Sequence, residues 1–488
     1  MIPAAPESTR RRSWRDPRPW HTNVALLLFG FLLICSTRQL LSENDQFSIG
    51  FSGVSSASAI LYLGAVVVFF LKPTNTNRFT LPIILTIAIA CRCVGLFSDP
   101  FLSSDVYRYA WDGVVQHAHI SPYRYAPGNA ALSFLRDPNI DLYSNMNRRD
   151  YAVTIYPPVA QIVFYLLTFI SPTVTFMKVS MVLFEGLTVY GLVLLLRRLN
   201  LPREWVLLYA WCPVCIWEFG SSGHLDAMVI ALIVFAFYFR HRRQPVLTGL
   251  FLGLAVFTKF YPLVLFPALY QLRPNRRLEW KMPATIVLVA VVSYSFYLSA
   301  GKRVFGFLGG YVEEEGMATG SRFFPLEFLQ HLPGLHALPN GLYLAFCGVI
   351  ASALVFWTWR TACQPESEPS SFLKPAMCVA LAMMLMFSPH YPWYVAWLVP
   401  FLLLTPSLTL LTYVLGLFYM CTTALATGSG APQFRLNEIL YSAVALAAVV
   451  EFLLYRFAST RNFLKRLAPY SFAHSHQQGM QTKESVAG

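Results

Sequence analysis

A short polar stretch of the sequence carries the residue types needed for acid–base chemistry. Residues 98–125 read SDPFLSSDVYRYAWDGVVQHAHISPYRY and directly follow an apolar run. If residues 104–117 form a helix, one of its faces is strongly polar, because positions three, four and seven residues apart align. That face carries Asp105, Arg108, Tyr109 and Asp112.

Asp105 is the best candidate in this set for a general base. It lies nearest the end of the preceding apolar run, where partial burial and Arg108 would set the basicity of a carboxylate. Two structural interpretations stay open beside this one. The polar face could be a solvated Asp–Arg–Asp ladder, and Ser104 with Asp105 could simply cap a helix.

Further ionisable residues stand at the edges of apolar runs. His224 and Asp226 lie in GSSGHLDAM, and Lys259 lies in FTKFYP. An ionised group costs roughly 2.5–3.5 kcal/mol at the bilayer centre, which favours a functional use and a convergence with the Asp105 helix. Two alternatives stay open. Asp226 could simply lie in the first turn of a helix, where the helix dipole favours a carboxylate. Lys259 could extend to the membrane surface instead of binding a lipid phosphate.

The last candidates are Arg322 in GSRFFP and the set His390, Tyr391 and Trp393 in SPHYPWYVAW. The aromatic side chains could form a stacking surface for a sugar ring, with Arg322 and His390 contacting a phosphodiester. Tyr and Trp are also typical of the aromatic belt at a membrane interface, so that interpretation remains open.

Composition indicates which elements hold these residues. The chain has 488 residues, of which 56% are hydrophobic and only 12% charged, far below the roughly 25% charged residues of soluble proteins. This is the composition of an integral membrane protein. The net charge of +13 comes from short Lys and Arg clusters between apolar runs, which suits cytoplasmic anchors and argues against a nucleic-acid partner.

The sequence therefore predicts an all-α polytopic membrane protein with about 13–14 transmembrane helices, each needing roughly 20 apolar residues. The predicted crossings are 23–42, 54–72, 79–97, 176–197, 204–220, 224–240, 246–258, 260–273, 282–301, 340–360, 372–389, 391–406, 408–427 and 437–457. Pro262 and Pro267 are expected to interrupt the region 246–273.

Basic residues are retained on the cytoplasmic side and predict the orientation. The basic arm 1–22 is expected inside, so three crossings place a large loop, 98–175, outside. The basic segment 195–204 is then inside only if 155–171 does not cross. We therefore expect 155–171 to be a helix lying in the outer interface.

The remaining basic loops then also fall inside, and the predicted domains follow. A membrane domain spans 23–457 and a cytoplasmic tail spans 458–488. We expect a multi-pass protein of the plasma membrane with both termini in the cytoplasm.

Several motifs together resemble a known family. SSDVYRYAWDGVVQHAHISPYRYAP, TIYPPVAQIVF, GSSGHLDAM, TKFYPLVLFP and SPHYPWYVAWLVP, in this order over about residues 79–405, resemble the bacterial polytopic GT-C glycosyltransferases of the polyprenyl-phosphate mannosyltransferase kind, glycosyltransferase family 87. The resemblance implies an inverting transfer of a hexose, with mannose as the family's sugar, from a polyprenyl-phosphate donor to a lipid or glycan acceptor of the cell envelope. It places the reaction on the exoplasmic face.

Carried onto this chain, the resemblance makes Asp105 the catalytic base. The expected substrate-binding residues are Arg108, Tyr109, Asp112, Tyr156, His224, Asp226, Lys259, Arg322, His390, Tyr391 and Trp393. Some GT-C enzymes bind a divalent metal through paired acidic residues, whereas Ser104 precedes Asp105 here. No metal ligand and no specific cofactor is therefore predicted, and a divalent metal stays an open alternative that no paired acidic motif supports.

The expected mechanism has Asp105 take a proton from an acceptor hydroxyl, while Lys259, Arg322 and His390 offset the charge of the leaving phosphate. The competing class is a transporter or lipid flippase without bond chemistry, which usually binds its substrate near the midplane and shows internal symmetry. The sequence has no evident repeat. A third class, an acyltransferase, would need an embedded catalytic histidine in another setting.

Overall fold

The computed structural model describes residues 18–43, 49–71, 77–317, 319–320, 323–388, 391, 393–422 and 433–456. In these segments every regular element is a helix, apart from one isolated antiparallel bridge between Arg273 and Arg277. The elements before the long α8 are α1 (Arg18–Leu40), α2 (Ile49–Leu71), α3 (Thr80–Leu96), α4 (Asp105–His117), η1 (Ala130–Leu132), α5 (Ser133–Arg136), η2 (Asp137–Asn139), α6 (Ile140–Asn145) and α7 (Pro158–Ile170).

The middle of the chain forms α8 (Val174–Arg198), η3 (Arg203–Val206), α9 (Leu207–Ala210), α10 (Pro213–Cys215), the π-helix η4 (Ile216–Ser221), α11 (Asp226–His241), α12 (Pro245–Val256), η5 (Tyr261–Leu265), α13 (Phe266–Leu269) and η6 (Pro274–Arg276). The rest forms α14 (Lys281–Ser295), η7 (Leu298–Phe305), α15 (Leu308–Glu314), α16 (Phe324–Gln330), α17 (Asn340–Thr361), α18 (Leu373–Phe387), α19 (Trp393–Ala396), α20 (Val399–Leu404), α21 (Leu408–Thr422) and α22 (Gln433–Arg456). The predicted all-helical polytopic class is confirmed.

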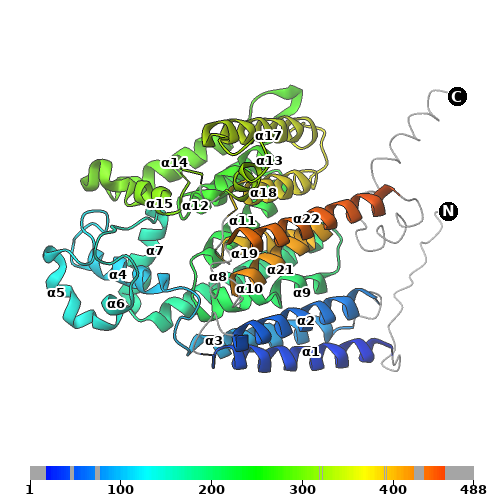
Figure 1. Ribbon diagram of the computed structural model, residues 1–488, viewed down its shortest axis with the longest axis horizontal. Helices are drawn as coiled ribbons and strands as arrows, with labels where there is room; N and C mark the ends of the chain where they lie inside the picture. The colour runs from blue at the N-terminus through cyan, green and yellow to red at the C-terminus, as the bar shows by residue number, and fades with distance from the viewer. Residues whose placement is uncertain are drawn as a thin grey trace, which may run out of the picture.

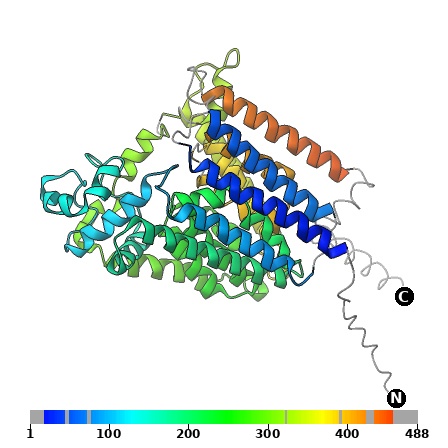
Figure 2. The same cartoon turned by 90° about the horizontal axis from the view of Figure 1, so that it is seen from below.

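The long helices pack side by side into a bundle (Figure 1). The helix α1 packs against both α2 and α3, α11 packs between α8 and α12, and α12 packs on α14. In both Figure 1 and Figure 2, α1 begins and α22 ends at one end of the bundle, whereas α4, α5 and α6 lie at the opposite end. The large loop predicted outside and the helix ends predicted inside are thus far apart.

Among the described residues, five helices are long and apolar enough to cross a bilayer on their own: α1, α2, α8, α17 and α22. A sixth crossing would be α14 together with Leu298–Glu314, a pair bent by 115°. Other apolar helices, such as α3, α12 and α18, have fewer than 18 residues. Five or six crossings are thus supported by helix length in the described residues. The others of the predicted 13–14 coincide with short or broken helices, and their number stays a prediction.

The predicted crossing 204–220 is an example of a broken one. It consists of η3, α9, α10 and the π-helix η4 instead of one straight helix. Pro213 has no backbone N–H and is the first residue of α10, so it ends the preceding hydrogen-bonded turns. The region 391–406 is similarly divided into α19 and α20, with Pro400 in the first turn of α20.

The helix α7 corresponds to the predicted interfacial helix 155–171. It begins at Pro158, where a proline fits the first helical turn, and its 13 residues span about 20 Å, too short for a hydrocarbon core of about 30 Å. One face packs on α4, while Leu166, Phe169 and Ile170 are 55–75% exposed. These features suit a helix lying along a membrane surface, and its position in the interface stays a prediction.

Close packing of α12 on α14 depends on two glycines spaced four residues apart. A Cβ atom at Gly249 would lie 2.5 Å from the Met282 carbonyl oxygen, and one at Gly253 would lie 3.2 Å from Val289 Cβ. Small residues in this spacing let membrane helices approach closely. This contact fixes the end of α12, which leads directly into Lys259.

Three segments that were predicted inside meet at one place. Arg240 donates to the Ala362 carbonyl at 2.9 Å, Leu272 N donates to the Cys363 carbonyl at 2.8 Å, and Arg243 donates to the Ser367 carbonyl at 2.8 Å. The loops after α11, α13 and α17 therefore share one end of the bundle, as the predicted topology requires.

Candidate active site

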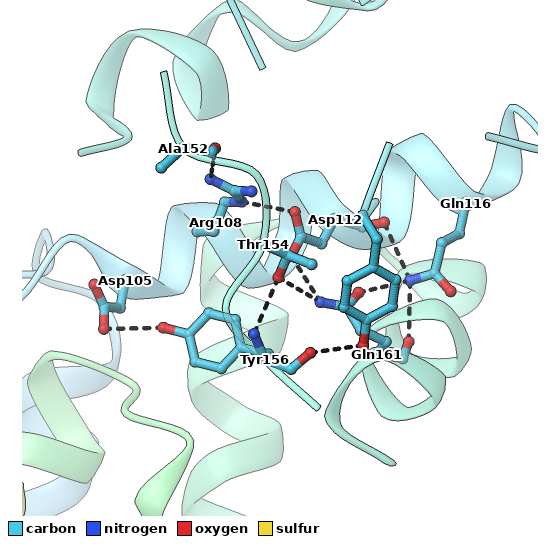
Figure 3. A network of polar contacts seen from close by, with 9 residues as sticks. Asp105, Arg108, Asp112, Gln116, Ala152, Thr154, Tyr156 and Gln161 are labelled. Carbon is cyan, nitrogen blue, oxygen red and sulfur yellow. Dashed lines mark hydrogen bonds and ion pairs between the residues drawn. The ribbon is translucent and has the colours of Figure 1, made fainter. Parts of the chain in front are cut away.

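Asp105 is the first residue of α4, which matches the helix predicted at 104–117. Its Oδ1 accepts a hydrogen bond from Asn147 Nδ2 at 3.0 Å, and its Oδ2 accepts one from the Tyr156 hydroxyl at 3.0 Å. Figure 3 shows Tyr156 pointing at this carboxylate. The side chain is 19% exposed, so Asp105 is fixed in position and still reachable.

A chain of charged groups continues from Asp105. His224 Nε2 lies 3.4 Å from Asp105 Oδ2, an ion-pair contact, and His224 Nδ1 lies 2.5 Å from Asp226 Oδ2. The same Asp226 oxygen accepts from Lys259 Nζ at 2.5 Å, and the Tyr261 hydroxyl donates to Asp226 Oδ1 at 2.9 Å. The convergence predicted between the Asp105 helix and His224 with Asp226 is confirmed, and Lys259 joins it.

Irregular backbone brings these groups together. The π-helix η4 ends just before His224, whose backbone N–H donates to the Glu218 carbonyl at 2.9 Å. Gly223 adopts φ +65°, and a Cβ atom there would lie 2.7 Å from Lys178 Cγ, so a side chain does not fit. π-bulges are frequent at functional sites, and this one turns His224 toward α4.

The surroundings favour the ionised form of Asp105. Burial alone raises the pKa of this carboxyl, but the contact and charge of His224, the Asn147 hydrogen bond and the charge of Lys259 outweigh burial. Together they hold the pKa of Asp105 well below its usual range. Burial and the neighbouring Asp105 raise the pKa of Tyr156, so the tyrosine remains a neutral donor to an ionised carboxylate.

Arg108 and Asp112 belong mainly to a buried network that joins α4 to α7 (Figure 3). Arg108 Nε lies 2.7 Å from Asp112 Oδ1, and Arg108 Nη1 donates to the Ala152 carbonyl at 3.0 Å. Gln161 Nε2 donates to Asp112 Oδ2 at 2.8 Å and to Thr154 Oγ1 at 2.7 Å. Asp112 is 1% exposed, so the solvated ladder considered from the sequence is wrong.

Aromatic rings surround the charged side chains that run from Asp105 to Lys259. Trp393 stacks on His224 with centroids 4.6 Å apart and on Tyr391 with centroids 4.4 Å apart, which places it within a three-ring stack. Tyr109 is fully buried, and its ring packs edge-on against Tyr156 at 5.1 Å. Trp393 and Tyr109 therefore support the neighbouring His224 and Tyr156, and neither presents an open face for a sugar.

Asp105 opens into a cavity of about 490 Å³. Its polar lining includes Asp105, Arg108, Asn147, Arg148, Tyr156 and Lys259. The helix α15 contributes Leu308 and Tyr311 to the wall. A second cavity of about 290 Å³ shares Tyr261, Tyr311, Met317 and Tyr394 with the first and is lined mainly by apolar residues such as Met383, Met384 and Phe387.

Several lining residues were not among the sequence candidates, and two of them, Asn147 and Arg148, form contacts that organise the site. Asn147 holds Asp105, and Arg148 Nε pairs with Glu314 Oε2 at 2.6 Å, which attaches the loop to α15. Both lie in SNMNRRD, an irregular segment with no periodicity to mark them. Their polar character beside an aromatic-rich loop was the available signal.

Two predicted residues, Arg322 and His390, lie outside the described residues. Within the described segments no group of three or more His, Cys, Asp or Glu side chains is placed to hold a metal ion. Asp226 is held by Lys259 and His224, so its carboxylate already has cationic partners.

Comparisons with known proteins point to one family of enzymes. The model of glycosyltransferase family 87 matches residues 154–389, which confirms the resemblance. A stretch of 137 residues is 28% identical to GPI mannosyltransferase 1 of Kluyveromyces lactis and covers 26% of this chain and 34% of that protein. No solved structure matches the chain.

Proposed function

Because residues 154–389 match glycosyltransferase family 87, we propose that the chain is a membrane glycosyltransferase that moves a hexose from a polyprenyl-phosphate donor to a hydroxyl of a lipid or glycan acceptor. Mannose is the proposed sugar, in keeping with the name of the yeast relative. The loop 98–175 supplies the catalytic base. The observation that carries the proposal is Asp105 itself, a fixed and ionised carboxylate that opens into a cavity of about 490 Å³.

The proposed reaction uses Asp105 as a general base. An acceptor hydroxyl donates its proton to the carboxylate, its oxygen attacks the anomeric carbon, and a carbon–oxygen bond forms. The bond from that carbon to the phosphate oxygen breaks on the opposite face, and its electron pair leaves with the polyprenyl phosphate. The configuration at the anomeric carbon is therefore inverted.

Positive groups in the cavity support a phosphate as the leaving group. Lys259 and Arg148 both line the cavity, each already held by a carboxylate. Fixed cations of this kind stabilise the charge that develops on a departing phosphate. The adjoining apolar cavity, lined by Met383 and Phe387, would hold the first part of the polyprenyl chain.

The proposed topology places the Asp105 end of the bundle on the exoplasmic face of the plasma membrane and both termini in the cytoplasm. Its support is that α4 lies at the opposite end from the start of α1 and the end of α22 (Figure 1). Because the arm 1–22 is proposed to be cytoplasmic and one crossing precedes residue 43, reporter fusions after residues 43 and 145 should both give exoplasmic signals. A fusion at residue 200, which the proposal places in the cytoplasm, supplies the contrasting signal.

One observation favours a second candidate, a lipid flippase. Asp226 begins α11 and Lys259 follows the end of α12, so charged groups meet at the ends of broken helices, an arrangement that many transporters use to bind substrate. A flippase would translocate the polyprenyl lipid and form no bond. Proteoliposomes with a labelled polyprenyl-phosphate hexose separate the two functions, since translocation without acceptor glycosylation supports the flippase alone.

The direct test is transfer by the purified protein. Labelled polyprenyl-phosphate mannose and a glycolipid acceptor are supplied to the wild type, to Asp105→Asn and to Asp141→Asn, a control in the exposed part of the same loop. We expect Asp105→Asn to lose about 10²–10⁴-fold of the rate, the usual contribution of a general base, and Asp141→Asn to retain it. Undiminished transfer by a folded Asp105→Asn variant would remove Asp105 from the mechanism.

A further inference from the structure

A separate polar cavity lies at the other end of α11 from Asp226. Its volume is about 250 Å³, and its walls come from the connection between α11 and α12 and from segment 269–282. Arg240 lines this cavity and follows Asp226 by fourteen residues in one helix. At about 1.5 Å per residue, the two ends are about 21 Å apart, so this cavity is distinct from the candidate active site.

The cavity has an excess of positive charge. Arg240, Arg243 and Arg273 line it together with a single carboxylate, Glu279. Glu279 is bound by Arg273 through two contacts at 2.8 and 3.0 Å, which offsets both charges. Arg240 and Arg243 donate to amide and carbonyl oxygens, and within the described segments neither forms an ion pair.

Unpartnered polar atoms lie beside the same cavity. Arg240 is 2% exposed, yet its Nε donor has no hydrogen-bond partner in the described part of the chain. The donor Gln271 Nε2 and the acceptor Gln244 Oε1 are also buried and have no hydrogen-bond partner in the described part of the chain. Leaving buried polar atoms unpaired is unfavourable. A ligand with both acceptor and donor atoms would therefore stabilise this cavity.

The surroundings are those of a membrane surface. Leu278 and Trp280 are 69% and 61% exposed, and the Arg273 guanidinium lies 5.9 Å from the centre of the Trp280 ring. Exposed apolar and tryptophan side chains beside arginines are typical of the boundary between lipid and water. A phospholipid could therefore reach the cavity from the side.

We propose that this cavity binds the phosphate group of an anionic phospholipid whose headgroup also carries a hydroxyl, as in phosphatidylglycerol. The phosphate oxygens accept from the Arg240 and Gln271 donors and are attracted by Arg243, and the headgroup hydroxyl donates to Gln244. Basic pockets between membrane helices are suited to such headgroups. This site is independent of the glycosyltransferase proposal, because none of its residues lines the Asp105 cavity.

The test measures lipid binding to the full-length, delipidated protein by native mass spectrometry. Phosphatidylglycerol, phosphatidic acid and phosphatidylcholine with identical acyl chains are compared, and inorganic phosphate is added as a competitor. We expect phosphatidylglycerol to bind about tenfold more tightly than phosphatidylcholine. Competition by millimolar phosphate would show that the site recognises a free phosphate as well, and resistance to it would show that the acyl chains are needed.

Three variants make the test specific. Arg243→Gln should lower phosphatidylglycerol affinity about fivefold, the effect of about 1 kcal/mol per basic residue, whereas Arg242→Gln, an exposed neighbour that does not line the cavity, should change nothing. Gln244→Leu should abolish the preference for phosphatidylglycerol over phosphatidic acid. Equal losses in Arg242→Gln and Arg243→Gln, or equal binding of the three lipids by the wild type, would overturn the proposal.

Discussion

His224 Nε2 lies 3.4 Å from Asp105 Oδ2 while its other ring nitrogen contacts Asp226. A neutral ring that donates to Asp226 would direct its lone pair at the Asp105 carboxylate, whereas a protonated ring carries an N–H and a positive charge toward both carboxylates. The geometry therefore favours a sequence of alternating charges: Lys259 positive, Asp226 negative, His224 positive and Asp105 negative. The face of Trp393 packed on His224 adds to this preference for a cation.

Replacement of His224 tests this alternation. His224→Gln keeps hydrogen-bonding atoms but removes the charge between the two carboxylates, so we expect kcat to fall at least about tenfold, the effect of about 1.4 kcal/mol. His119→Gln changes an exposed histidine just after α4 and should retain the wild-type rate. Transfer assays on both variants make the comparison, and full activity of His224→Gln would exclude an electrostatic role.

The pH dependence should respond to Asn147. The wild-type pKa of Asp105 is depressed, so the base stays ionised down to well below about pH 3.9, the ordinary value. Asn147→Ala removes a donor that favours the ionised form, so the pKa of Asp105 rises and activity is lost at a higher pH as the solution is acidified. Profiles of kcat/KM against pH for this variant and for Asn145→Ala, which does not contact Asp105, test the shift. Identical acid limbs would contradict the assigned contact.

Trp393 should affect turnover more than sugar binding. Aromatic pairs contribute about 0.5–1.5 kcal/mol beyond burial, so Trp393→Ala, which leaves His224 without its stacked ring, should lower kcat by about two- to tenfold with little change in KM. Trp393→Phe keeps a ring and should lie near the wild type. A large rise in KM for both would instead favour the sugar-stacking role expected from the sequence.

Arg108 and Asp112 should matter for stability. Asp112→Leu leaves the Arg108 guanidinium buried without its carboxylate, which typically costs about 3–5 kcal/mol. The double variant Arg108→Leu with Asp112→Leu removes both charges and should recover part of that loss. Melting temperatures in one detergent measure the effect, and a double variant less stable than the single one would show that the pair itself is strongly stabilising.

The sequence predicted the helical elements that position the site because polar periodicity and the distribution of basic residues both signal them. The spacing of polar residues predicted α4. The basic loops all fall on the cytoplasmic side only if α7 does not cross the membrane, which predicted an interfacial helix there. The meeting of Asp105 with His224 followed from placing both at ends of crossings on one side. These parts depend on periodicity and topology, which a sequence carries directly.

Other parts of the site depend on tertiary contacts that no local pattern records. Hydropathy predicted a crossing at 204–220 but could not reveal the π-helix that turns His224 toward α4. Asn147 and Arg148 lie in an irregular loop, and their partners Asp105 and Glu314 are distant in sequence. Likewise, Asp112 was expected on a polar face, whereas Gln161 from α7 encloses it.

The helix α11 begins with Asp226 at one cavity and carries Arg240 at the other. Each added residue advances an α-helix by about 1.5 Å and turns it by about 100°. Inserting or deleting a single residue between these two positions would therefore rotate one functional end away from its partners while the other stayed in place. The length of α11 is consequently constrained even where its side chains are ordinary apolar ones.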